Sequence, residues 1–488
     1  MIKIQNYIGG ELHDSCSGKK FDVIAPGSGQ IYGFAPRSNT EDANMAFHAA
    51  KSAFEGWKSL PVEKRSAYLR AIADGIETEA KSFAKAESQD SGKPLWLCEK
   101  VDIPRASKNF RFFADTIQNY HGDSFQRGGY QFDYTLNEPL GPVTCISPWN
   151  LPLYLFSWKI APALASGCTV VAKPSEVTPL TAYLLSKVCQ DVQLPAGVLN
   201  VIHGLGAEIG AAVVEHPHTK AVSFTGGTET GKTIARSCAD RFIPTSLELG
   251  GKNPAVVFKD ANIEKSAKEI VRSSFTNQGQ ICLCSSRILI AREVYEDFSN
   301  LFKKHTSELV VGPPSAPSSN LGAVVSLEHK EKIMGFIDAA NNSGALISLG
   351  EHHPSVDPSL QDDTWKNGYY VYPTIIENLP NDHLVNQQEI FGPVVTLQPF
   401  DSYDHAIKLA NECAYGLSAT IWTDNLETAH RAAADLQAGV IWINSWLERD
   451  LRTPFGGHKQ SGLGKEGGMH ALDFFHQRKN VSLTISSS

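Results

Sequence analysis

The segment SSFTNQGQICLCSSR places a cysteine, Cys282, after a glycine-containing turn at the expected end of a helix. A free cysteine has a pKa near ~8.5, so only a few per cent of it is thiolate at neutral pH. A nucleophilic role therefore requires local stabilisation of the thiolate or a nearby base. Cys284, two residues further on, is an equal candidate from the residues alone, and a cysteine is more often a buried structural residue.

Two further motifs supply a base and a hydrogen-bond donor for such a nucleophile. Glu248 lies in SLELGGKNP between two leucines and beside a glycine pair, where desolvation would raise its pKa into the range useful for a general base. The alternative is a surface glutamate at the end of a strand. Asn150, in ISPWNLP, offers an amide N–H where a tetrahedral oxyanion would form. The alternative there is an Asx turn between two prolines.

A third group of residues indicates a nucleotide cofactor. The segment VVAKPSE ends a short β-branched run with Lys173 and Glu176, and nucleotides bind at the carboxyl ends of parallel strands. A glutamate at this position accepts hydrogen bonds from both hydroxyls of an adenosine ribose and repels a 2′-phosphate, which favours NAD over NADP. The segment FTGGTETGK predicts a strand, a glycine turn and a helix whose first N–H groups meet a pyrophosphate.

The same glycine turn, from Gly226 to Thr233, also fits the phosphate-binding loop of ATPases, which makes an ATPase an alternative function. Against it, no hydrophobic run ends in an aspartate suited to hold magnesium. The cysteine and glutamate motifs would also have no role in an ATPase. The glycines of HGLGAEIG add little, because their spacing is not the usual dinucleotide fingerprint.

Hydrophobic periodicity predicts a hairpin around Gly9-Gly10, followed by helices near 41–57, 62–86 and 98–118. Short β-branched runs then alternate with helical stretches, and this alternation predicts a parallel sheet with helices on both faces. The expected strands lie at 143–147, 169–173, 199–203 and 220–224, with helices near 155–166, 179–192 and 207–216.

A second alternating stretch, from about 255 to 440, predicts a second α/β domain. Residues 120–138 and the tail after Asn480 have strand character without neighbouring helices. Such strands would form exposed edges that invite a partner subunit.

Composition limits the classes of function. A chain of 488 residues predicts two or three domains. The net charge of −8 and the scattered basic residues argue against a nucleic-acid partner. The nine cysteines show no CxxC pair and no zinc-finger spacing, so we expect no metal site. Without a signal or transit peptide, they predict reduced thiols in a cytoplasmic protein. The uncharged stretch from Pro139 to Trp158 is interrupted by prolines, so we expect no membrane span.

Seven segments follow one another along the chain as SPWNLPL, KPSE, FTGGTETG, LELGGKNP, FTNQGQIC, EIFGPV and PFGGHKQSG. In this order and spacing they resemble the aldehyde dehydrogenase superfamily over essentially the whole chain. The resemblance implies the α/β aldehyde dehydrogenase fold, with a Rossmann-like NAD-binding domain, an α/β catalytic domain and a small β oligomerisation extension. A homodimer or homotetramer is expected.

The implied domain boundaries follow the motifs. Residues 1–119 and 139–249 would form the NAD-binding domain, and residues 250–440 the catalytic domain. Residues 441–467 would form a substrate-tunnel and anchor loop, and residues 120–138 and 468–488 the oligomerisation strands.

The resemblance also resolves the choice of nucleophile, because in the family it follows the GQx triplet, which selects Cys282. It implies that Cys282 attacks the aldehyde carbon to give a thiohemiacetal, with Asn150 and the Cys282 backbone N–H holding the oxyanion. Hydride then passes to NAD and leaves a thioester. Glu248 activates the water that releases the acid. The glycine turn of the ATPase alternative serves the dinucleotide instead.

Further positions carry over in the same way. Lys159 and Glu466 match positions linked in the family to proton relay. Gly227 departs from the pattern, because relatives usually carry serine there, so a hydroxyl toward the pyrophosphate is lost. The expected cofactor-binding residues are Ser147, Pro148, Trp149, Lys173, Ser175, Glu176, Gly206, Phe224, Thr225, Gly226, Gly227, Thr230, Leu249, Glu389 and Phe391.

Two segments resemble the branch that oxidises 2-aminomuconate and 2-hydroxymuconate semialdehydes in tryptophan (kynurenine) and catechol breakdown. SWLERDLRTPFGG places Arg449 where many relatives carry an aromatic residue of the substrate tunnel, and DIPRASKNFRFFAD places Arg105 beside its entrance. A guanidinium stays ionised and grips a carboxylate bidentately, so both, with Arg452, are expected to bind substrate. The alternatives are an ion pair of Arg449 with its acidic neighbours and of Arg105 with Asp102.

The preferred substrate is 2-aminomuconate 6-semialdehyde, with 2-hydroxymuconate semialdehyde as the alternative. A neutral aldehyde such as retinal is a further alternative, because Trp149, Tyr154 and Trp158 could admit it. An inactive structural member of the family is opposed by the joint presence of the three catalytic residues. A coenzyme A-dependent enzyme is disfavoured because the hydrolytic base is present.

Overall fold

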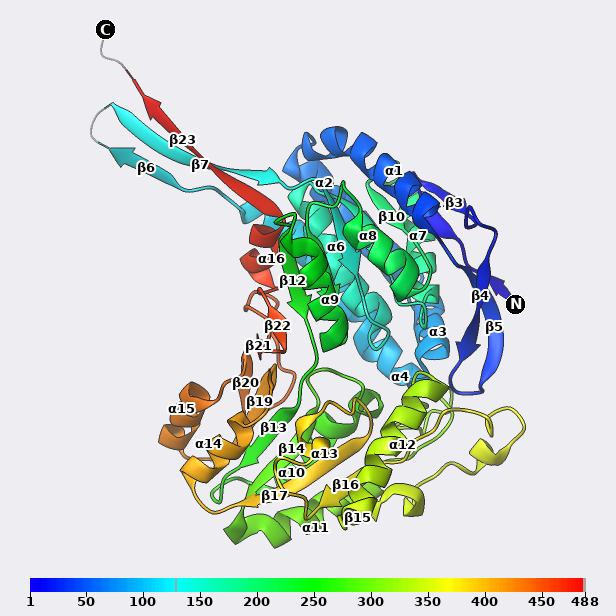
Figure 1. The fold of residues 1–488 in the computed structure, drawn as a ribbon, viewed down its shortest axis with the longest axis vertical. Helices are drawn as coiled ribbons and strands as arrows, with labels where there is room; N and C mark the ends of the chain where they lie inside the picture. The colour runs from blue at the N-terminus through cyan, green and yellow to red at the C-terminus, as the bar shows by residue number, and fades with distance from the viewer. Residues whose placement is uncertain (128–129, 486–488) are drawn as a thin grey trace.

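The computed structural model describes residues 1–127 and 130–485. Two α/β units lie one above the other, and an arm of strands projects from the upper unit (Figure 1). The N-terminal part of the chain forms the upper unit, and the chain then builds the lower one. The C-terminal residues return to the upper unit and end in the arm.

The sheet of the upper unit has a parallel centre, in which β12, β11, β8, β9 and β10 pair in parallel. The chain runs from β8 outward to β10 on one side and then through β11 and β12 on the other. The direction of winding therefore reverses between β8 and β11, which is where such sheets bind ligands. The full order is β22 (Gly462–Leu463), β12 (Thr245–Glu248), β11 (Val222–Thr225), β8 (Pro142–Ile146), β9 (Thr169–Lys173), β10 (Leu199–Val201), β2 (Asn6–Ile8) and β3 (Glu11–His13).

This sheet confirms the predicted parallel architecture. Strands β8 and β9 are buried along their whole length, as expected for parallel strands covered on both faces. The helices of the unit are α1 (Thr40–Lys58), α2 (Val62–Thr78), α3 (Ala80–Ser91), α4 (Leu95–Leu97), α5 (Ile103–Thr116), α6 (Pro152–Ser166), α7 (Leu180–Asp191), α8 (Ala211–Glu215) and α9 (Thr228–Ala239).

Two predicted helices differ from the observed ones. The stretch 62–86 contains two helices, α2 and α3, because the chain leaves the helical conformation at Glu79 (φ −96°, ψ 18°). The helix predicted over 98–118 begins with a wider π-helical turn, Cys98–Asp102, before α5 starts. Such turns inside helices are frequent at functional sites.

The lower unit confirms the predicted second α/β domain. Its sheet is parallel except for the edge strand β15, and follows the order β15 (Leu346–Leu349), β16 (Thr374–Glu377), β17 (Val394–Phe400), β14 (Ser285–Ala291), β13 (Asn253–Val257), β19 (Ser418–Trp422) and β20 (Val440–Ile443). Its helices are α10 (Ile263–Phe275), α11 (Tyr295–Ser307), α12 (Leu327–Asn342), α13 (Leu384–Gln387), α14 (Tyr403–Asn411) and α15 (Leu426–Asp435).

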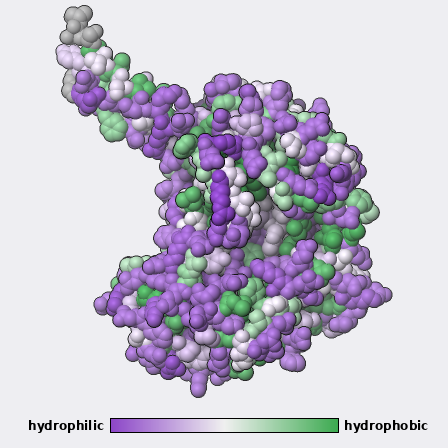
Figure 2. Space-filling view, in the orientation of Figure 1, coloured by the Kyte–Doolittle hydropathy of each residue, from purple (hydrophilic) through white to green (hydrophobic). Residues whose placement is uncertain are grey.

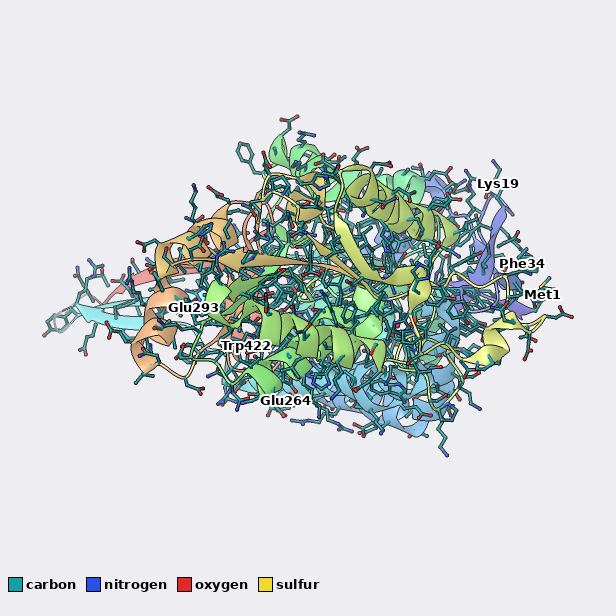
Figure 3. The ribbon with its side chains drawn as sticks, turned by 90° about the horizontal axis from the view of Figure 1, so that it is seen from below. Met1, Lys19, Phe34, Glu264, Glu293 and Trp422 are labelled. Atoms are coloured by element: carbon teal, nitrogen blue, oxygen red, sulfur yellow. The ribbon has the colours of Figure 1, made fainter. Side chains whose placement is uncertain are left out.

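Residues 441–467 link the two units. They continue β20 in the lower sheet, add β22 to the upper sheet and pair β21 (His458–Lys459) with β18 (Tyr415–Gly416). A further small sheet of β1 (Ile2–Lys3), β5 (Gln30–Pro36) and β4 (Lys20–Ala25) lies at the end of the molecule opposite the arm (Figure 3).

The arm consists of β6 (Ser124–Arg127), β7 (Gln131–Pro139) and β23 (His476–Thr484), paired antiparallel in the order β23-β7-β6. The prediction that 468–488 is all strand is wrong at its start, because Gly468–Phe474 forms helix α16. Leu472 of this helix is buried in the core of the upper unit, which fixes it against the body rather than in the arm. Residues 128–129 and 486–488 of the expected strands lie outside the described residues.

The surface of the arm mixes hydrophobic with hydrophilic residues (Figure 2). Large apolar side chains on all three strands are exposed, namely Phe125, Phe132, Leu136 and Leu483. Over residues 1–127 and 130–485, no helix is both long enough and apolar enough to cross a membrane.

Candidate active site

A cavity of about 260 Å³ opens between the two units and is lined by residues of both. The upper unit contributes the loops that follow β8, β11 and β12, and the lower unit contributes the loops before β14 and β17. The cavity therefore lies at the point where the winding of the upper sheet reverses. The residues expected at the site that line it are Pro148, Trp149, Asn150, Thr225, Gly226, Gly227, Leu249, Cys282, Glu389 and Phe391.

Cys282 and Cys284 differ in their access to this cavity. Cys282 is half-buried and lines it, whereas Cys284 is buried and does not. The loop is fixed by Asn253, whose amide donates to the carbonyl oxygens of Cys282 (2.7 Å) and Cys284 (2.9 Å). It is preceded by a turn in which Asn277 and Gln278 adopt left-handed backbone (φ 54° and 56°). Such strained residues persist where the surrounding structure holds them in place.

Asn150 follows β8, and its loop is held from two sides. Its amide nitrogen donates to the carbonyl oxygen of Gln280, 2.9 Å away. Within the described part of the chain this is the amide's one hydrogen-bond acceptor, so its second N–H remains available to a ligand in the cavity. The carbonyl oxygen of Asn150 accepts hydrogen bonds from Lys93 Nζ and Asn277 Nδ2, both at 3.0 Å.

Glu248, the last residue of β12, is only 3% exposed, and its two carboxylate oxygens have no hydrogen-bond partner among the described residues. Burial, with Glu466 nearby, raises the pKa of Glu248 well above its ordinary value, although Lys159 and Arg449 oppose the shift. Burial also raises the pKa of Cys282, and Glu389 and Glu248 add to that rise. Cys282 and Glu248 are therefore within electrostatic range of each other, and the raised pKa of Glu248 makes its ionised carboxylate a stronger base.

Lys159 and Glu466 form a buried ion pair behind this site. The Lys159 ammonium lies 2.8 Å from Glu466 Oε1 and 3.1 Å from the Ser223 hydroxyl. The side chain of Lys159 is fully buried and that of Glu466 is 8% exposed. Because both charges act on the pKa of Glu248, a chain of titratable groups leads from it toward the interior.

The predicted ribose-binding residues lie together at the end of β9. Lys173 Nζ contacts Glu176 Oε2 at 2.5 Å, and Glu176 Oε1 accepts a hydrogen bond of 2.9 Å from the Gly206 N–H. Burial alone would raise the pKa of Glu176, but Lys173 and the Gly206 N–H outweigh it and lower that pKa. Glu176 is therefore an ionised acceptor. Ser175 caps the turn that follows, donating no bond to this pair but accepting one from Val177 N–H.

The glycine turn after β11 leads directly into α9. The helix begins after Gly227, and no side chain there accepts a hydrogen bond from its first N–H groups. Free N–H groups at a helix N-terminus form an anion-binding site. The hydroxyls of Thr225 and Thr228 have no partner among the described residues, and a Cβ on Gly227 would meet nothing within 4 Å. Thr230 is exposed on the first turn of this helix.

The remaining cofactor candidates frame the turn. The ring of Phe224 packs against the glycine turn, because a Cβ on Gly226 would lie only 2.4 Å from that ring. Ser147 is buried, and its hydroxyl lacks a partner among the described residues. Glu389 Oε1 accepts a hydrogen bond of 2.8 Å from the Gly251 N–H. Phe391 has a left-handed backbone (φ 62°), and its ring stands edge-on to Trp149 at 5.2 Å between centroids.

Arg105 and Arg449 converge on one aromatic ring. Their guanidinium carbons lie 5.6 and 4.9 Å from the centre of the Trp158 ring. Arg105 also lies over Tyr154 (4.8 Å) and Arg449 over Phe455 (3.9 Å). Those two rings pack in the same apolar cluster as Cys282. Both arginines therefore lie over aromatic rings that belong to the apolar cluster around Cys282.

Neither arginine is neutralised by a carboxylate. Buried nitrogens of both, Nη2 of Arg105 and Nε and Nη2 of Arg449, have no acceptor among the described residues. The alternative partner of Arg105, Asp102, is instead bound to Lys93 at 2.7 Å. Burial lowers the pKa of Arg105, and the charge of Arg449 adds to this lowering. Two partly buried cations without a salt bridge among the described residues are costly to desolvate, and an anionic ligand would reduce that cost.

Arg452 lies apart from this pair, contrary to the expectation. Its guanidinium is exposed and bound to Asp450 at 2.6 Å, so the ion-pair alternative raised for Arg449 is realised by Arg452 instead. A flexible, exposed side chain pairs readily with its nearest acidic neighbour. We therefore do not retain Arg452 as a substrate ligand.

Several residues of the site could not be identified from sequence. Asn109 orients Arg105, accepting from its Nε at 2.9 Å while donating to the Tyr154 carbonyl oxygen at 3.0 Å. Lys93 and Asn277 hold the Asn150 loop from positions 57 and 127 residues away. Of these, Asn109 and Asn277 lay in segments that sequence had singled out, and Lys93 did not. Within the described ranges, no group of three or more His, Cys, Asp or Glu residues is placed to hold a metal ion.

Comparison with known proteins places this geometry in a family. The model of the aldehyde dehydrogenase family matches residues 13–481. The 2-hydroxymuconic semialdehyde dehydrogenase of Pseudomonas sp. (strain CF600) is 42% identical over 99% of this chain and 100% of its own length. The 2-aminomuconic semialdehyde dehydrogenase of Danio rerio is 44% identical over 99% of this chain and 98% of its own.

A solved structure agrees with these relatives. The NAD⁺ complex of an aldehyde dehydrogenase from Bacillus cereus superposes with a TM-score of 0.95 at 35% identity, covering 99% of this chain and 97% of that one. The chain therefore belongs to the aldehyde dehydrogenase family. The resemblance carried by the seven motifs and the predicted fold are confirmed, and the ATPase alternative is excluded.

Proposed function

We propose that this enzyme uses NAD to oxidise a muconic semialdehyde, with 2-aminomuconate 6-semialdehyde as the expected substrate and its 2-hydroxy analogue as the alternative. The observation that carries the proposal is the convergence of Arg105 and Arg449 on the Trp158 ring, beside the apolar cluster of Cys282, with no salt-bridge partner for either among the described residues. A carboxylate at the far end of an aldehyde would supply the missing charge and hydrogen-bond acceptors.

The chemistry begins at Cys282. Its thiol gives a proton to Glu248 and its sulfur bonds to the aldehyde carbon, which forms a thiohemiacetal. The amide of Asn150 and the backbone N–H of Cys282 donate to the developing oxyanion, where one such donor contributes roughly 2.7–4 kcal/mol of transition-state stabilisation. With NAD bound, the thiohemiacetal would lose a hydride to the cofactor and become a thioester, and water from which Glu248 takes a proton would then hydrolyse it. The unpaired carboxylate with a raised pKa supports this double use of one base.

Protons leaving Glu248 have a route into the protein. Lys159 and Glu466 are in contact with each other and within electrostatic range of Glu248. We propose that they relay the proton away from the site. Their burial supports this role, because an isolated buried pair contributes little net stability by itself.

NAD fits the chain's own residues. Glu176, ionised and beside Lys173, would accept the two hydroxyls of the adenosine ribose and repel a 2′-phosphate. The uncapped start of α9 would hold the pyrophosphate, and Glu389 would meet the second ribose. When bound, NAD accepts the hydride of the substrate. The B. cereus relative solved as an NAD⁺ complex supports this assignment.

The arginine pair would bind a carboxylate, which both semialdehydes carry, so it does not select between them. They differ by one amine-for-hydroxyl exchange, and relatives named for each substrate match this chain at 44% and 42% identity. The aminomuconate substrate would place the enzyme in tryptophan breakdown and the hydroxymuconate one in catechol breakdown. The unpaired indole N–H of Trp158, buried between the two arginines, is a donor that either substrate could engage.

The expected domains and assembly stand as part of the proposal. Residues 1–119 and 139–249 would carry NAD, residues 250–440 the nucleophile, and residues 441–467 the tunnel wall with Arg449. The arm formed by β6, β7 and β23 would join subunits into a homodimer or homotetramer, because its exposed apolar side chains need cover. A cytoplasmic location stays a prediction.

The first experiment measures NADH formation at about 340 nm with 2-hydroxymuconate semialdehyde, retinal and propanal in parallel. We expect kcat/KM for the semialdehyde to exceed that for the neutral aldehydes by at least ~10²-fold, or about 2.7 kcal/mol. Equal or faster turnover of the neutral aldehydes would overturn the substrate proposal. It would leave the family assignment intact.

A further inference from the structure

A buried group of charged residues lies directly beneath the Asn150 loop. Glu87, Lys93 and Asp102 are exposed by 0%, 0% and 1%. The Lys93 ammonium lies 2.7 Å from Asp102 Oδ2 and 3.4 Å from Glu87 Oε1. Burial alone would lower the pKa of Lys93, but Asp102 and Glu87 outweigh it and raise that pKa, so the ammonium is charged. We call these residues the Lys93 cluster.

The third acceptor of Lys93 is the candidate oxyanion residue. Lys93 Nζ donates to the carbonyl oxygen of Asn150 at 3.0 Å, and thus uses its remaining proton on this loop. Glu87 holds the same loop further on, because its Oε2 accepts a hydrogen bond of 3.2 Å from the Leu153 N–H. The Lys93 cluster therefore holds the chain at Asn150 and at Leu153, in the first turn of α6.

The chain around Lys93 is itself rigid. α3 ends at Gly92, whose φ of +74° favours glycine, and a Cβ there would lie 2.8 Å from the Ala323 carbonyl oxygen. The Ser88 hydroxyl donates to the Lys93 carbonyl oxygen at 2.7 Å. Asp102 is the last residue of the π-helical turn that leads into α5. Lys93 thus has little freedom to move away from Asn150.

Stability alone does not account for this arrangement. A buried ion pair is often no more stabilising than well-packed apolar side chains of the same size. The geometry of an oxyanion site, by contrast, is demanding, because a displacement of about 1 Å can reduce the rate ~10²-fold. A charged tether that fixes the backbone of Asn150 also fixes where its amide points.

We propose that Lys93, held by Asp102 and Glu87, is a positioning residue that aims the amide of Asn150 at the oxyanion. The inference rests on the oxyanion role proposed for Asn150. Lys93 touches neither sulfur nor substrate in this scheme and acts only through the loop. Its removal therefore affects the rate of the chemical step and leaves the binding of NAD in place.

The test is a double-mutant cycle of Lys93→Met and Asn150→Ala in the full-length enzyme, with propanal and NAD. We expect Asn150→Ala to lower kcat about 10²- to 10³-fold and Lys93→Met about 10- to 100-fold. The double variant should be no slower than Asn150→Ala by more than about twofold, because both changes remove one function. KM for NAD should stay within about threefold of the wild-type value.

Two further variants keep the test interpretable. If Lys93→Met does not fold, Lys93→Met/Asp102→Asn removes one charge of each sign together and carries the same expected loss. The matched control is Asp90→Asn. Asp90 is fully buried and lies on the same helix as Glu87, α3, where it contacts Tyr32 and the Leu180 N–H but not the Asn150 loop. Burial raises the pKa of Asp90 to about 8, so the asparagine amide resembles the protonated carboxyl of Asp90 at neutral pH. Because Asp90 does not contact the Asn150 loop, kcat should not change.

The outcomes separate the two proposals. A wild-type kcat in Asn150→Ala overturns the oxyanion role and the positioning role together. A slow Asn150→Ala with a wild-type Lys93→Met overturns the positioning role alone. Losses that simply multiply in the double variant also overturn it, because they assign Lys93 an effect independent of Asn150.

Discussion

The guanidinium groups of Arg105 and Arg449 lie against one indole ring, at 5.6 and 4.9 Å from the centre of Trp158. The two arginines are 344 positions apart in the chain and belong to α5 and to the loop after β20. Like charges repel, so two cations held together without a carboxylate cost free energy in the free enzyme. An anionic substrate would recover that cost, and for this reason we propose that the pair selects substrates with a carboxylate.

Arg449→Ala should separate anionic from neutral substrates. We expect kcat/KM for 2-hydroxymuconate semialdehyde to fall about 10²-fold, because a charge-assisted bidentate contact is lost, while propanal turnover changes less than about threefold. The matched control is Arg452→Ala, since that exposed guanidinium is bound by Asp450 and should have no effect. Unchanged semialdehyde oxidation by Arg449→Ala would remove the carboxylate-binding role.

Glu248→Gln should slow both halves of the reaction, because the amide can take a proton neither from the Cys282 thiol nor from the hydrolytic water. Stopped-flow measurement of NADH is expected to show no rapid burst and a steady rate about 10²- to 10⁴-fold below wild type. A burst of one equivalent per active site before a slow steady rate would mean that Glu248 is needed only for hydrolysis of the thioester.

The raised pKa of Glu248 also predicts how pH affects activity and stability. The base is active when deprotonated, so wild-type kcat should rise with pH through the raised value. The folded state binds a proton that the unfolded state releases near pH ~4.3, so the free energy of unfolding should fall as pH rises above that value. Glu248→Gln should make this decrease smaller by the contribution of Glu248, whereas the raised pKa of Asp90 still contributes, and urea titrations across the pH range would measure the difference. If the free energy of unfolding of the variant fell with pH as steeply as that of the wild type, Glu248 would not contribute to the decrease.

Gly227→Ser should tighten NAD binding. The backbone φ of −67° suits any residue, and the added side chain meets nothing within 4 Å. One new hydrogen bond to the pyrophosphate is worth about 0.5–1.5 kcal/mol, so Kd for NAD should fall roughly 2- to 12-fold in calorimetry. As a control, Gly226→Ser should weaken binding, because its Cβ would lie 2.4 Å from the Phe224 ring. An unchanged Kd would place the pyrophosphate elsewhere.

Lys159→Met should destabilise the fold. Glu466 would be left as a buried carboxylate with only the Ser223 hydroxyl as a partner, at a cost of roughly 3–5 kcal/mol in the free energy of unfolding. Adding Glu466→Gln should restore most of this loss, because the buried charge is then gone. Urea denaturation measures both, and a loss below about 1 kcal/mol for the single variant would show that water reaches Glu466.

Lysines on the arm should reduce the oligomeric state. Leu136→Lys and Leu483→Lys place charges on β7 and β23, where apolar side chains are exposed by 42% and 47%. Sedimentation velocity is expected to show smaller species, because a charge cannot be buried unpaired at an interface. Leu426→Lys, exposed by 74% at the start of α15, is the control and should leave assembly unchanged. An unaltered assembly in the arm variants would exclude this surface as the contact.

Much of the fold followed from local pattern. The β-branched runs that became β8, β9, β10 and β11 were predictable, because each is short, apolar and separated by a helical stretch. The break at Glu79 and the helix at Gly468–Phe474 were not, since both depend on which face packs against the body. Periodicity reports that a residue prefers burial, but it does not report the surface that buries it.

The sequence by itself identified the family and predicted the nucleophile, the base and the oxyanion amide, because Cys282, Glu248 and Asn150 each lie in one of the seven ordered motifs that carry the family resemblance. Only the tertiary structure decided which charges meet. It joined Arg105 to Arg449, bound Arg452 to Asp450 and placed Lys93 under Asn150. The strength of an electrostatic interaction depends on the distance between the two charges in space. For residues far apart in the chain, only folding brings the charges close enough to interact.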